Sequence, residues 1–488
     1  MTLRKGCAVE RSLSSDIRRF ARNGIALALG GVASQVVFVF IEVLIARQLG
    51  SETYGIFATT YAVVLFAVYL IDAGTAWWTV QEGSRDEAKL PALLGNSVTS
   101  ELLIFFSLYI LLLVSLLLLF PSQPNKQFVA IFCIYALVLA IQANLAAVFA
   151  SQQRMHITAL FQGSAAIAVF AIYWISAARD DSLRSVAIAY VLGAGLVTGI
   201  WFAWTAASLR PKLSVRGIRS MLSQSYLYAM TGVLGQVLYK ADIILLASLA
   251  GAREAGIYAA AFKFLDLFYK IPILAGRVFT PSLFKRSTEN WPAYRKLASG
   301  YARTQALVGA SACLLTLLLA EELVLVTFGS EYVESVPILR VLSAAMAIKC
   351  LIVASEGLLS SLGQHKVRVV LMASAAVLNI CLNLLLIPIL GGVGAAVGTV
   401  ITGFLLVSLY ALIGLKSLGS RRVLKWFLVP MTLIALIAFV VMGITQTSWV
   451  RLILALASVP ILVFVTRYIR INEIVVILNG LWARPAKR

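Results

Sequence analysis

The stretch "GQVLYKADIILLASLAGAREAGIYA" (residues 235–259) decides the fold, because its pattern already occurs 201 residues earlier as "SQVVFVFIEVLIARQLGSETYGIFA" (34–58). Hydropathy alone explains shared Leu, Val and Ala in membrane helices, but it does not explain matched Gln and loop Gly positions. In the later copy, Lys240 and Asp242 interrupt an apolar run that is uninterrupted at the same two positions of the earlier copy. The matched residues include Gln35 with Gln236, Gly50 with Gly251, and Gly55 with Gly256.

The composition is typical of a membrane protein with many spans. Of the 488 residues, 61% are hydrophobic and 13% are charged, and the mean hydropathy is +0.92; soluble domains lie far from these values. A helix needs roughly 20 apolar residues to cross hydrocarbon about 30 Å thick. Such stretches predict fourteen transmembrane helices and no sizeable soluble domain: 24–49, 55–80, 92–120, 127–150, 157–178, 184–208, 220–249, 255–280, 300–328, 335–362, 367–390, 392–415, 423–445 and 450–469.

The formal net charge of +20 is distributed unevenly among the loops. Alternate loops are rich in Lys and Arg, as are the N-terminal segment and the C-terminal tail, whereas the opposite loops carry Glu321, Glu322, Glu331 and Glu334. This positive-inside pattern predicts that both termini face the cytoplasm. The basic excess therefore indicates orientation in the membrane, and we expect no nucleic-acid partner.

A second, weaker echo occurs at an offset of 210, where residues 151–168 resemble residues 361–378. An even number of predicted spans separates the copies in both echoes, so each copy has the same orientation. This predicts a parallel repeat, a design common in transporters, although a bundle duplicated only for packing is the alternative. We expect an all-α integral membrane protein with a basic cytoplasmic N-terminus (1–23), an N-lobe of six helices (24–212), a C-lobe of six helices (213–416), two further helices (417–470) and a cytoplasmic tail (471–488).

Searches for enzymatic motifs give nothing. The sequence has no phosphate-binding Gly-rich loop ending in Gly-Lys-Ser/Thr, no Gly-x-Ser-x-Gly and no His-Glu-x-x-His. The two histidines, His156 and His365, fall in short predicted loops, and four of the five cysteines lie in apolar segments at unrelated spacings. We therefore expect no catalytic residues, no metal site and no cofactor.

Ionisable residues inside the predicted spans are the candidate functional residues, because each charge at a span centre costs roughly 2.5–3.5 kcal/mol on insertion scales. They concentrate in the second half of the chain, and Lys263, Asp266 and Lys270 share one helical face. The candidates are the basic Lys240, Lys263, Lys270 and Lys349, the acidic Glu42, Asp72, Asp242, Asp266 and Glu356, and the polar Gln35, Gln236, Asn379 and Asn383.

Two interpretations of these charges stay open. The charges can be satisfied pairs that hold helices together, Lys263 with Asp266 and Lys349 with Glu356. Alternatively, four lysines against few carboxylates predict a cationic, water-filled cavity, which attracts an anionic ligand such as phosphate or diphosphate. For Asn379 and Asn383 we favour packing between helices.

One segment also resembles a known family. Residues 328–401 are similar to the polysaccharide flippases of the multidrug/oligosaccharidyl-lipid/polysaccharide exporter superfamily, the Wzx-type O-antigen flippases and their relatives. The segment 45–64 resembles the first helical hairpin of that family, so the resemblance covers both lobes. The residues that carry it are Gly329, Tyr332, Gly363, Lys366, Asn379, Asn383, Ile387, Pro388, Gly391, Gly394, Ala395 and Ala396, with Gly50, Tyr54 and Gly55 in the hairpin.

The resemblance implies a flippase that moves a polyprenyl-diphosphate-linked oligosaccharide across the bacterial inner membrane by alternating access. It implies that the four lysines bind the diphosphate, that the carboxylates couple transport to Na⁺ or H⁺ or hold the lysines, and that a glycan polymerase or synthesis complex is a partner. A small-molecule or multidrug antiporter of the same superfamily is the first alternative. A membrane glycan polymerase or ligase is the second, and the short outer loops argue against it.

Overall fold

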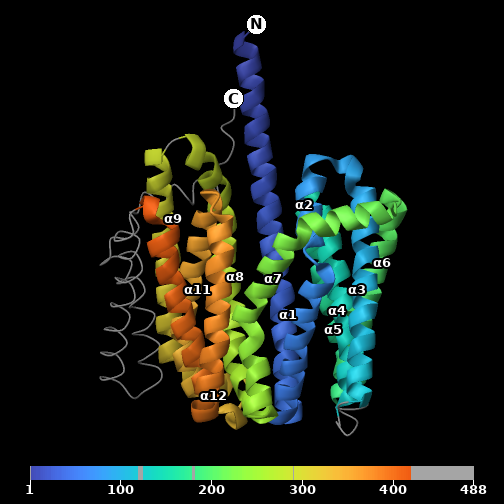
Figure 1. Cartoon of the computed structure of the whole chain (residues 1–488), viewed down its shortest axis with the longest axis vertical. Coiled ribbons are helices and arrows are strands. Elements are labelled where there is room, and N and C mark those ends of the chain that lie inside the picture. The colour runs from blue at the N-terminus through green and yellow to red at the C-terminus, as the bar shows by residue number, and fades with distance from the viewer. Residues whose placement is uncertain (1, 119–124, 178–181, 290, 419–488) are drawn as a thin grey trace. The chain divides into compact units, whose positions relative to one another are not determined.

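The computed structural model describes residues 2–118, 125–177, 182–289 and 291–418, and every regular element in these ranges is helical (Figure 1). The predicted spans 423–445 and 450–469 and the predicted tail 471–488 lie outside the described residues. The helices are α1 (Thr2–Asp72), α2 (Thr75–Arg85), α3 (Leu90–Leu118), α4 (Lys126–Ser151), α5 (Met155–Ala177), α6 (Leu183–Leu209), α7 (Val215–Leu249), α8 (Ala252–Glu289), α9 (Trp291–Leu318), α10 (Ala320–Thr327), α11 (Ser335–Ser361) and α12 (His365–Leu409), with short helical turns at Glu87–Lys89, Ser330–Tyr332, Tyr410–Gly414 and Lys416–Leu418.

The helices have the length and surface expected in a lipid bilayer. Within the described ranges, eight helices are long and apolar enough to cross a membrane, or nine if the bent pair α9 and α10 forms one span. Large apolar side chains such as Leu118 (74% exposed) and Ile389 (77% exposed) stay on the surface. Such exposure is normal where hydrocarbon replaces water as the solvent. The predicted all-α integral membrane fold is confirmed.

Two of the long helices each contain two predicted spans. In α1 the chain changes direction at Gly50 (φ 77°, ψ 172°), and in α12 it does so at Gly391 (φ 54°, ψ −134°). Both backbone conformations are open to glycine and costly for residues with a Cβ atom. These glycines therefore separate consecutive spans without an intervening loop.

Two predicted spans are interrupted in the structure. The span predicted at 55–80 ends at Asp72, and Ala73 (φ 48°) and Gly74 (φ 79°) turn the chain before α2 begins. The span predicted at 300–328 bends by 71° between α9 and α10. Apolar runs lie on both sides of each break, so the acidic residues there, Asp72 at the first and Glu321 and Glu322 after the second, did not mark the breaks in the hydropathy pattern.

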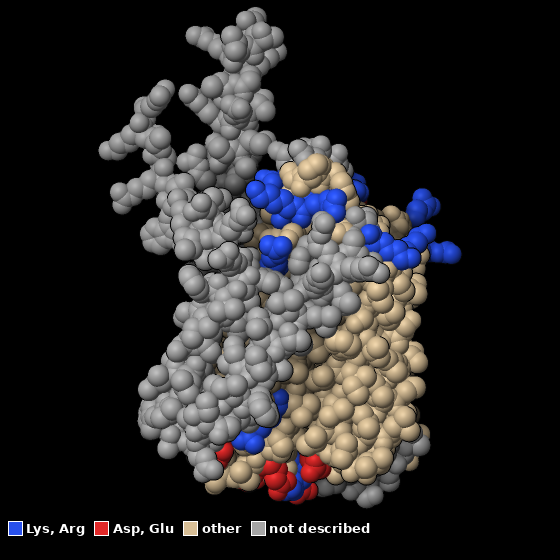
Figure 2. Space-filling view, turned by 90° about the vertical axis from the view of Figure 1, so that its left-hand side faces the viewer, with Lys and Arg blue, Asp and Glu red and all other residues tan. Residues whose placement is uncertain are grey.

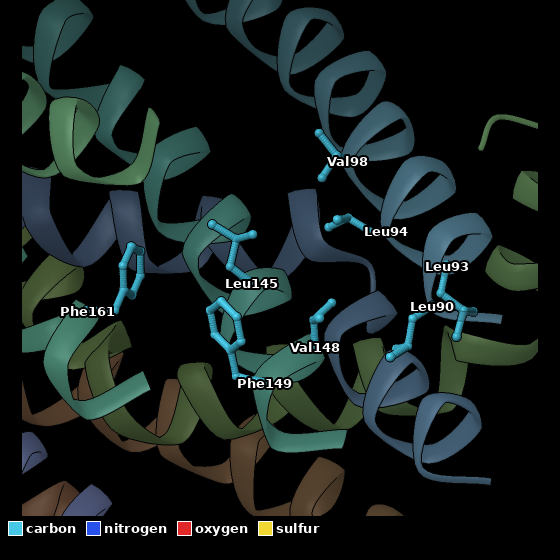
Figure 3. Packing of buried hydrophobic residues seen from close by; sticks show 8 residues of the cluster. All are labelled: Leu90, Leu93, Leu94, Val98, Leu145, Val148, Phe149 and Phe161. Atoms are coloured by element: carbon cyan, nitrogen blue, oxygen red, sulfur yellow. The ribbon is translucent and has the colours of Figure 1, made fainter. Parts of the chain in front are cut away.

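The chain forms two compact units, Met1–Gly256 and Ile257–Arg488. In the first unit α7 packs against α1, α2 and α3. The first unit also has an apolar core formed by side chains of α3, α4 and α5, which are shown as sticks in Figure 3. The core residues are Leu90, Leu93, Leu94, Val98, Leu145, Val148, Phe149 and Phe161.

Helix ends follow the weaker sequence echo. α4 ends at Ser151 and α11 at Ser361, and the next helices begin at Met155 and His365, so each pair of ends is 210 residues apart. Charged residues lie at the two ends of the face shown in Figure 2, with most of its Lys and Arg at one end and Asp and Glu at the other. Between these ends, the described part of this face is largely uncharged, as the membrane interpretation expects.

Candidate functional site

Lys263 and Asp266 form an ion pair inside α8 of the second unit. The Lys263 Nζ atom lies 3.6 Å from Asp266 Oδ2, and the two side chains are only 8% and 11% exposed. Their i, i+3 spacing places them on one helical face, as the sequence predicts. Lys270, one turn further along α8, is exposed. Burial of two charges is costly unless they pair. The ion pair therefore allows both charged side chains to stand at buried positions of a mostly apolar helix.

Lys349 in α11 contacts an aromatic ring of α8. Its Nζ atom lies 5.7 Å from the centre of the Tyr269 ring, a distance at which the ring face attracts a cation. The predicted pairing of Lys349 with Glu356 stays a prediction, and the charge of Lys349 acts on this carboxyl. Arg368 of α12 also places its Nη2 atom 3.2 Å from Glu356 Oε2. The partner comes from the next helix, which spacing within α11 cannot predict.

The first unit holds the other charged candidates on α1 and α7. Lys240, Asp242 and Gln236 are buried on α7, at 6%, 4% and 7% exposure. The Lys240 Nζ atom lies 5.0 Å from the centre of the neighbouring Tyr239 ring, and Asp242 accepts a hydrogen bond from the backbone N–H of Ile243. On α1, Glu42 is buried and Gln35 is half-buried. A joint site of Lys240 with the three lysines of the second unit stays a prediction.

Asn379 and Asn383 form a polar pair on the first segment of α12. Both are buried, and Asn383 Nδ2 donates to Asn379 Oδ1 at 3.0 Å. The Oδ1 atom of Asn383 has no hydrogen-bond partner among the described residues. The i, i+4 spacing therefore lets the two side chains bond to each other within one helix, and the Asn383 amide oxygen receives no hydrogen bond from the described residues.

Asp72 lies where α1 breaks and caps the start of α2. Its carboxylate accepts hydrogen bonds from the backbone N–H groups of Gly74 and Ala76, at 3.2 and 2.9 Å, and from the Thr75 hydroxyl at 3.1 Å. The N-cap residue of α2 is Gly74, which has no side chain, and Asp72, two residues earlier, accepts from amides that lack a partner within the helix. Asn144 of α4 also approaches the same carboxylate, at 3.5 Å.

Sequence reasoning missed Glu101, which joins this group. Glu101 in α3 is completely buried and accepts a hydrogen bond from Asn144 Nδ2. The signal was visible, because an acidic residue stands inside the span predicted at 92–120. Arg368 was also missed as a partner, since it lies at the start of a predicted span, on the side predicted to be cytoplasmic, where basic residues are common.

Comparisons with known proteins agree with the resemblance seen in the sequence. A family model described as "Polysaccharide biosynthesis protein" matches residues 20–285, more than half of the chain. No curated protein matches the chain. The comparison with solved structures gives matches over nearly the whole chain, although all three described next are less than 20% identical in sequence.

The lipid II flippase MurJ in an inward closed conformation has a TM-score of 0.70 at 15% identity, over 91% of this chain and 100% of that one. A eukaryotic MATE transporter has a TM-score of 0.63 at 17% identity, over 85% of this chain and 98% of that one. A transporter of the MOP superfamily from Pyrococcus furiosus, whose binding pocket has reversed polarity, has a TM-score of 0.59 at 13% identity, over 86% and 95%.

These similarities show a fold shared by a flippase and by transporters. The lysine-bearing α8 begins within the matched family region, and both sequence echoes lie on helices of this fold. The chain belongs to the polysaccharide biosynthesis protein family.

Proposed function

We propose that the chain is a flippase for a polyprenyl-diphosphate-linked oligosaccharide, an O-antigen, capsule or exopolysaccharide unit. It moves this lipid from the cytoplasmic to the outer face of a bacterial inner membrane by alternating access, with both of its own termini in the cytoplasm. Membership of a polysaccharide biosynthesis family supports the glycan. The fold that the chain shares with a lipid II flippase supports the lipid carrier.

The observation that carries the proposal is the basic excess within the spans of the second unit. Lys263, Lys270, Lys349 and Arg368 stand in the predicted spans 255–280, 335–362 and 367–390, and the acidic residues of these three spans are Asp266 and Glu356. Four cations against two carboxylates leave a positive field in a region of low dielectric constant. Such a field is stronger than the same charges produce in water, and it favours an anion.

A diphosphate headgroup fits this field for chemical reasons. It carries negative charge on oxygen atoms that accept hydrogen bonds, and lysine ammonium groups donate three hydrogen bonds each. The polyprenyl tail needs no protein cavity, because the exposed apolar helix faces of this chain are already solvated by lipid. The glycan then reaches the outer face, where we expect a glycan polymerase or synthesis complex to receive it.

A small-molecule or multidrug antiporter is the second candidate. The buried carboxylates Asp72 and Glu101 favour it, since acidic groups within spans attract cationic drugs. MATE transporters also share the fold. The two candidates differ in the residues that should matter, because an antiporter of cations would not need Lys263 or Lys349.

The test is genetic complementation in the native cell. A strain that lacks the gene receives Lys263→Ala or Lys349→Ala, and surface glycan and lipid-linked intermediates are measured at equal protein level in the membrane. We expect loss of surface glycan and accumulation of the lipid-linked unit on the cytoplasmic face. Normal glycan in both variants would exclude the proposed diphosphate site.

Two further variants control for folding and for general loss of charge. Lys366→Ala removes an exposed lysine at the start of α12 and should leave surface glycan normal. The double variant Lys263→Gln/Asp266→Asn removes both members of the ion pair, so it leaves no unpaired buried charge. It should reach the membrane at normal level and still fail to export glycan.

A further inference from the structure

A buried polar cluster lies in the first unit where α2, α3 and α4 meet, and Glu101 is its centre. Glu101 stands eleven residues after the start of α3, about 17 Å along the helix axis, which is too deep for its short side chain to reach the membrane surface. Its side chain is 0% exposed, and its Oε2 atom has no hydrogen-bond partner in the described ranges. Neither Glu101 nor Asp72 forms an ion pair with any described residue.

The Asn144 amide cannot satisfy the oxygen atoms that surround it. Its Nδ2 atom lies within hydrogen-bond distance of Glu101 Oε1, of Thr75 Oγ1 at 3.1 Å and of Asp72 Oδ1 at 3.5 Å. An amide nitrogen carries two hydrogens, so one of the three oxygens receives none. The Oδ1 atom of Asn144, also in a side chain with 0% exposure, has no donor among the described residues. The cluster therefore has more acceptors than donors.

The two carboxylates differ in how their charge is compensated. Asp72 lies at the N-terminus of α2 and accepts two backbone N–H groups there, so the positive end of the helix dipole offsets its charge. Glu101 has a single amide donor, and Asp72 repels it. One negative charge is thus left without compensation in this cluster.

The surroundings make that charge expensive. The residues that flank the cluster along α3 and α4, Leu94, Val98 and Leu145, belong to the apolar core and point between these helices in Figure 3. Burial of an isolated carboxylate in such an environment costs roughly several kcal/mol, even after the protein relaxes around it. Such a carboxylate therefore acquires a cation or a proton. Carboxylate, amide and hydroxyl oxygens are the ligands that hard cations prefer.

The geometry points to a monovalent-cation site in the first unit, formed by the carboxylate of Glu101 and the Oδ1 atom of Asn144, with the Asp72 carboxylate and the Thr75 hydroxyl beside them. A monovalent cation balances the one uncompensated charge, and sodium is the cation used as the probe. Among the described residues no group of three or more His, Cys, Asp or Glu side chains gathers as a divalent or transition-metal site would require. The Glu101 Oε2 and Asn144 Oδ1 atoms, which receive no hydrogen bond from the described residues, are then ligands of the cation.

The site is connected to α7, which carries Lys240 and Asp242. The Ser225 hydroxyl of α7 donates to the backbone oxygen of Ala73 at 2.8 Å, immediately after Asp72. A cation that tightens the turn at Asp72 would therefore act on the position of α7. This coupling role rests on the proposed function, whereas cation binding itself does not.

The experiment measures sodium binding by the purified full-length chain in detergent, without any lipid-linked substrate. Retention of radioactive sodium and thermal unfolding are measured in sodium chloride against choline chloride at equal ionic strength. A ligand that binds only the folded state stabilises it by RT ln(1 + [L]/Kd), so the unfolding temperature rises with the ligand concentration. We expect saturable sodium binding and a higher unfolding temperature in sodium.

Glu101→Gln removes the charge and keeps the shape, and it should weaken sodium binding by about tenfold or more, equivalent to roughly 1.4 kcal/mol. Asp72→Asn, which keeps a side chain suited to cap α2, is the second variant and should weaken binding in the same direction. Glu82→Gln changes a carboxylate on α2 that is paired at the surface with Arg85 and Lys89, and it should bind sodium like the wild type.

Three results would overturn the site. The first is an absence of saturable sodium binding in the wild type, and the second is wild-type binding in both Glu101→Gln and Asp72→Asn. The third is stabilisation by acid with no effect of sodium at any pH, because it would mean that a proton neutralises Glu101. A chain that binds sodium but exports no glycan would contradict the proposed function and leave the site in place.

Discussion

Gln153 and Gly363, which are 210 residues apart, hold the same left-handed backbone conformation in equivalent turns. Their φ angles are 56° and 71°. Each backbone N–H donates to the carbonyl three residues earlier, of Ala150 at 3.0 Å and of Ser360 at 3.1 Å. The hydroxyls of Ser151 and Ser361 also bond the equivalent carbonyls at 2.7 and 2.8 Å. The faint sequence echo is therefore a repeated local structure.

The repeated turn makes a prediction about Gly363. A Cβ atom there would meet nothing within 4 Å, so backbone strain is the only cost of a substitution. Gly363→Ala should lower the free energy of unfolding by about 1 kcal/mol, and Gly363→Asn should cost less, because Asn tolerates the left-handed region. Thermal unfolding in detergent measures both.

The matched control is Gly199→Ala. Gly199 is inside α6 with helical geometry, and a Cβ atom there also meets nothing within 4 Å. This variant should be neutral or more stable by up to about 1 kcal/mol, since Ala is the better helix former. Equal destabilisation by Gly199→Ala and Gly363→Ala would show that the φ angle of Gly363 is not the cause.

The ion pair between Glu356 and Arg368 predicts strong coupling in a double-mutant cycle. The side chains are 20% and 25% exposed, so a single substitution leaves a largely buried charge without its partner. The destabilisation caused by Glu356→Gln and that caused by Arg368→Gln should add up to more than the destabilisation caused by the double variant. The difference, which is the coupling energy, should be roughly 0.5–3 kcal/mol. A coupling energy near zero would mean that the two residues do not interact in the membrane.

Glu82 on α2, outside the predicted membrane-crossing helices, predicts a weak pH dependence of stability. Its hydrogen bond with Lys89, supported by Arg85, holds the pKa of this carboxyl below its usual value. Because the pKa is lower in the folded state, the stabilisation is present above the unfolded pKa of about 4.3 and disappears as pH falls through the folded pKa.

The measurement compares the unfolding temperature of wild type and Glu82→Gln between neutral and acid pH. The difference should vanish at acid pH and shrink in high salt, because Arg85 and Lys89 are exposed to solvent. A difference that is the same at every pH would assign the effect to packing and not to the charge of Glu82.

Hydropathy and spacing predicted much of this fold, because lipid selects long apolar helices and the positions of polar residues on them. The i, i+3 spacing of Lys263 and Asp266 placed both on one helical face, and their ion pair was one of the two interpretations that the sequence left open. The break at Asp72 was not predicted, although the sequence Asp-Ala-Gly-Thr contains a capping residue and a glycine. An apolar run on both sides concealed it.

Contacts between helices were harder to predict. Glu356 was expected to pair with Lys349 on its own helix, and a partner that was not expected, Arg368, reaches it from α12 across the turn at Gly363. Glu101 and Asn144 are 43 residues apart, and only the packing of α3 against α4 brings them together. Spacing within a helix defines a face of that helix, whereas tertiary packing decides which partner this face meets.

The most direct test of the account is transport by the purified chain in lipid vesicles. A labelled polyprenyl-diphosphate oligosaccharide is placed in the membrane, and its passage between leaflets is followed with an impermeant reagent that reacts only with the outer headgroup. The wild type should accelerate passage. Lys349→Ala should be about tenfold slower or more, as expected from the loss of one charge-assisted hydrogen bond of roughly 1.5–3 kcal/mol, and Lys366→Ala should match the wild type. Passage no faster than in empty vesicles, or equal rates for wild type and Lys349→Ala, would contradict the account.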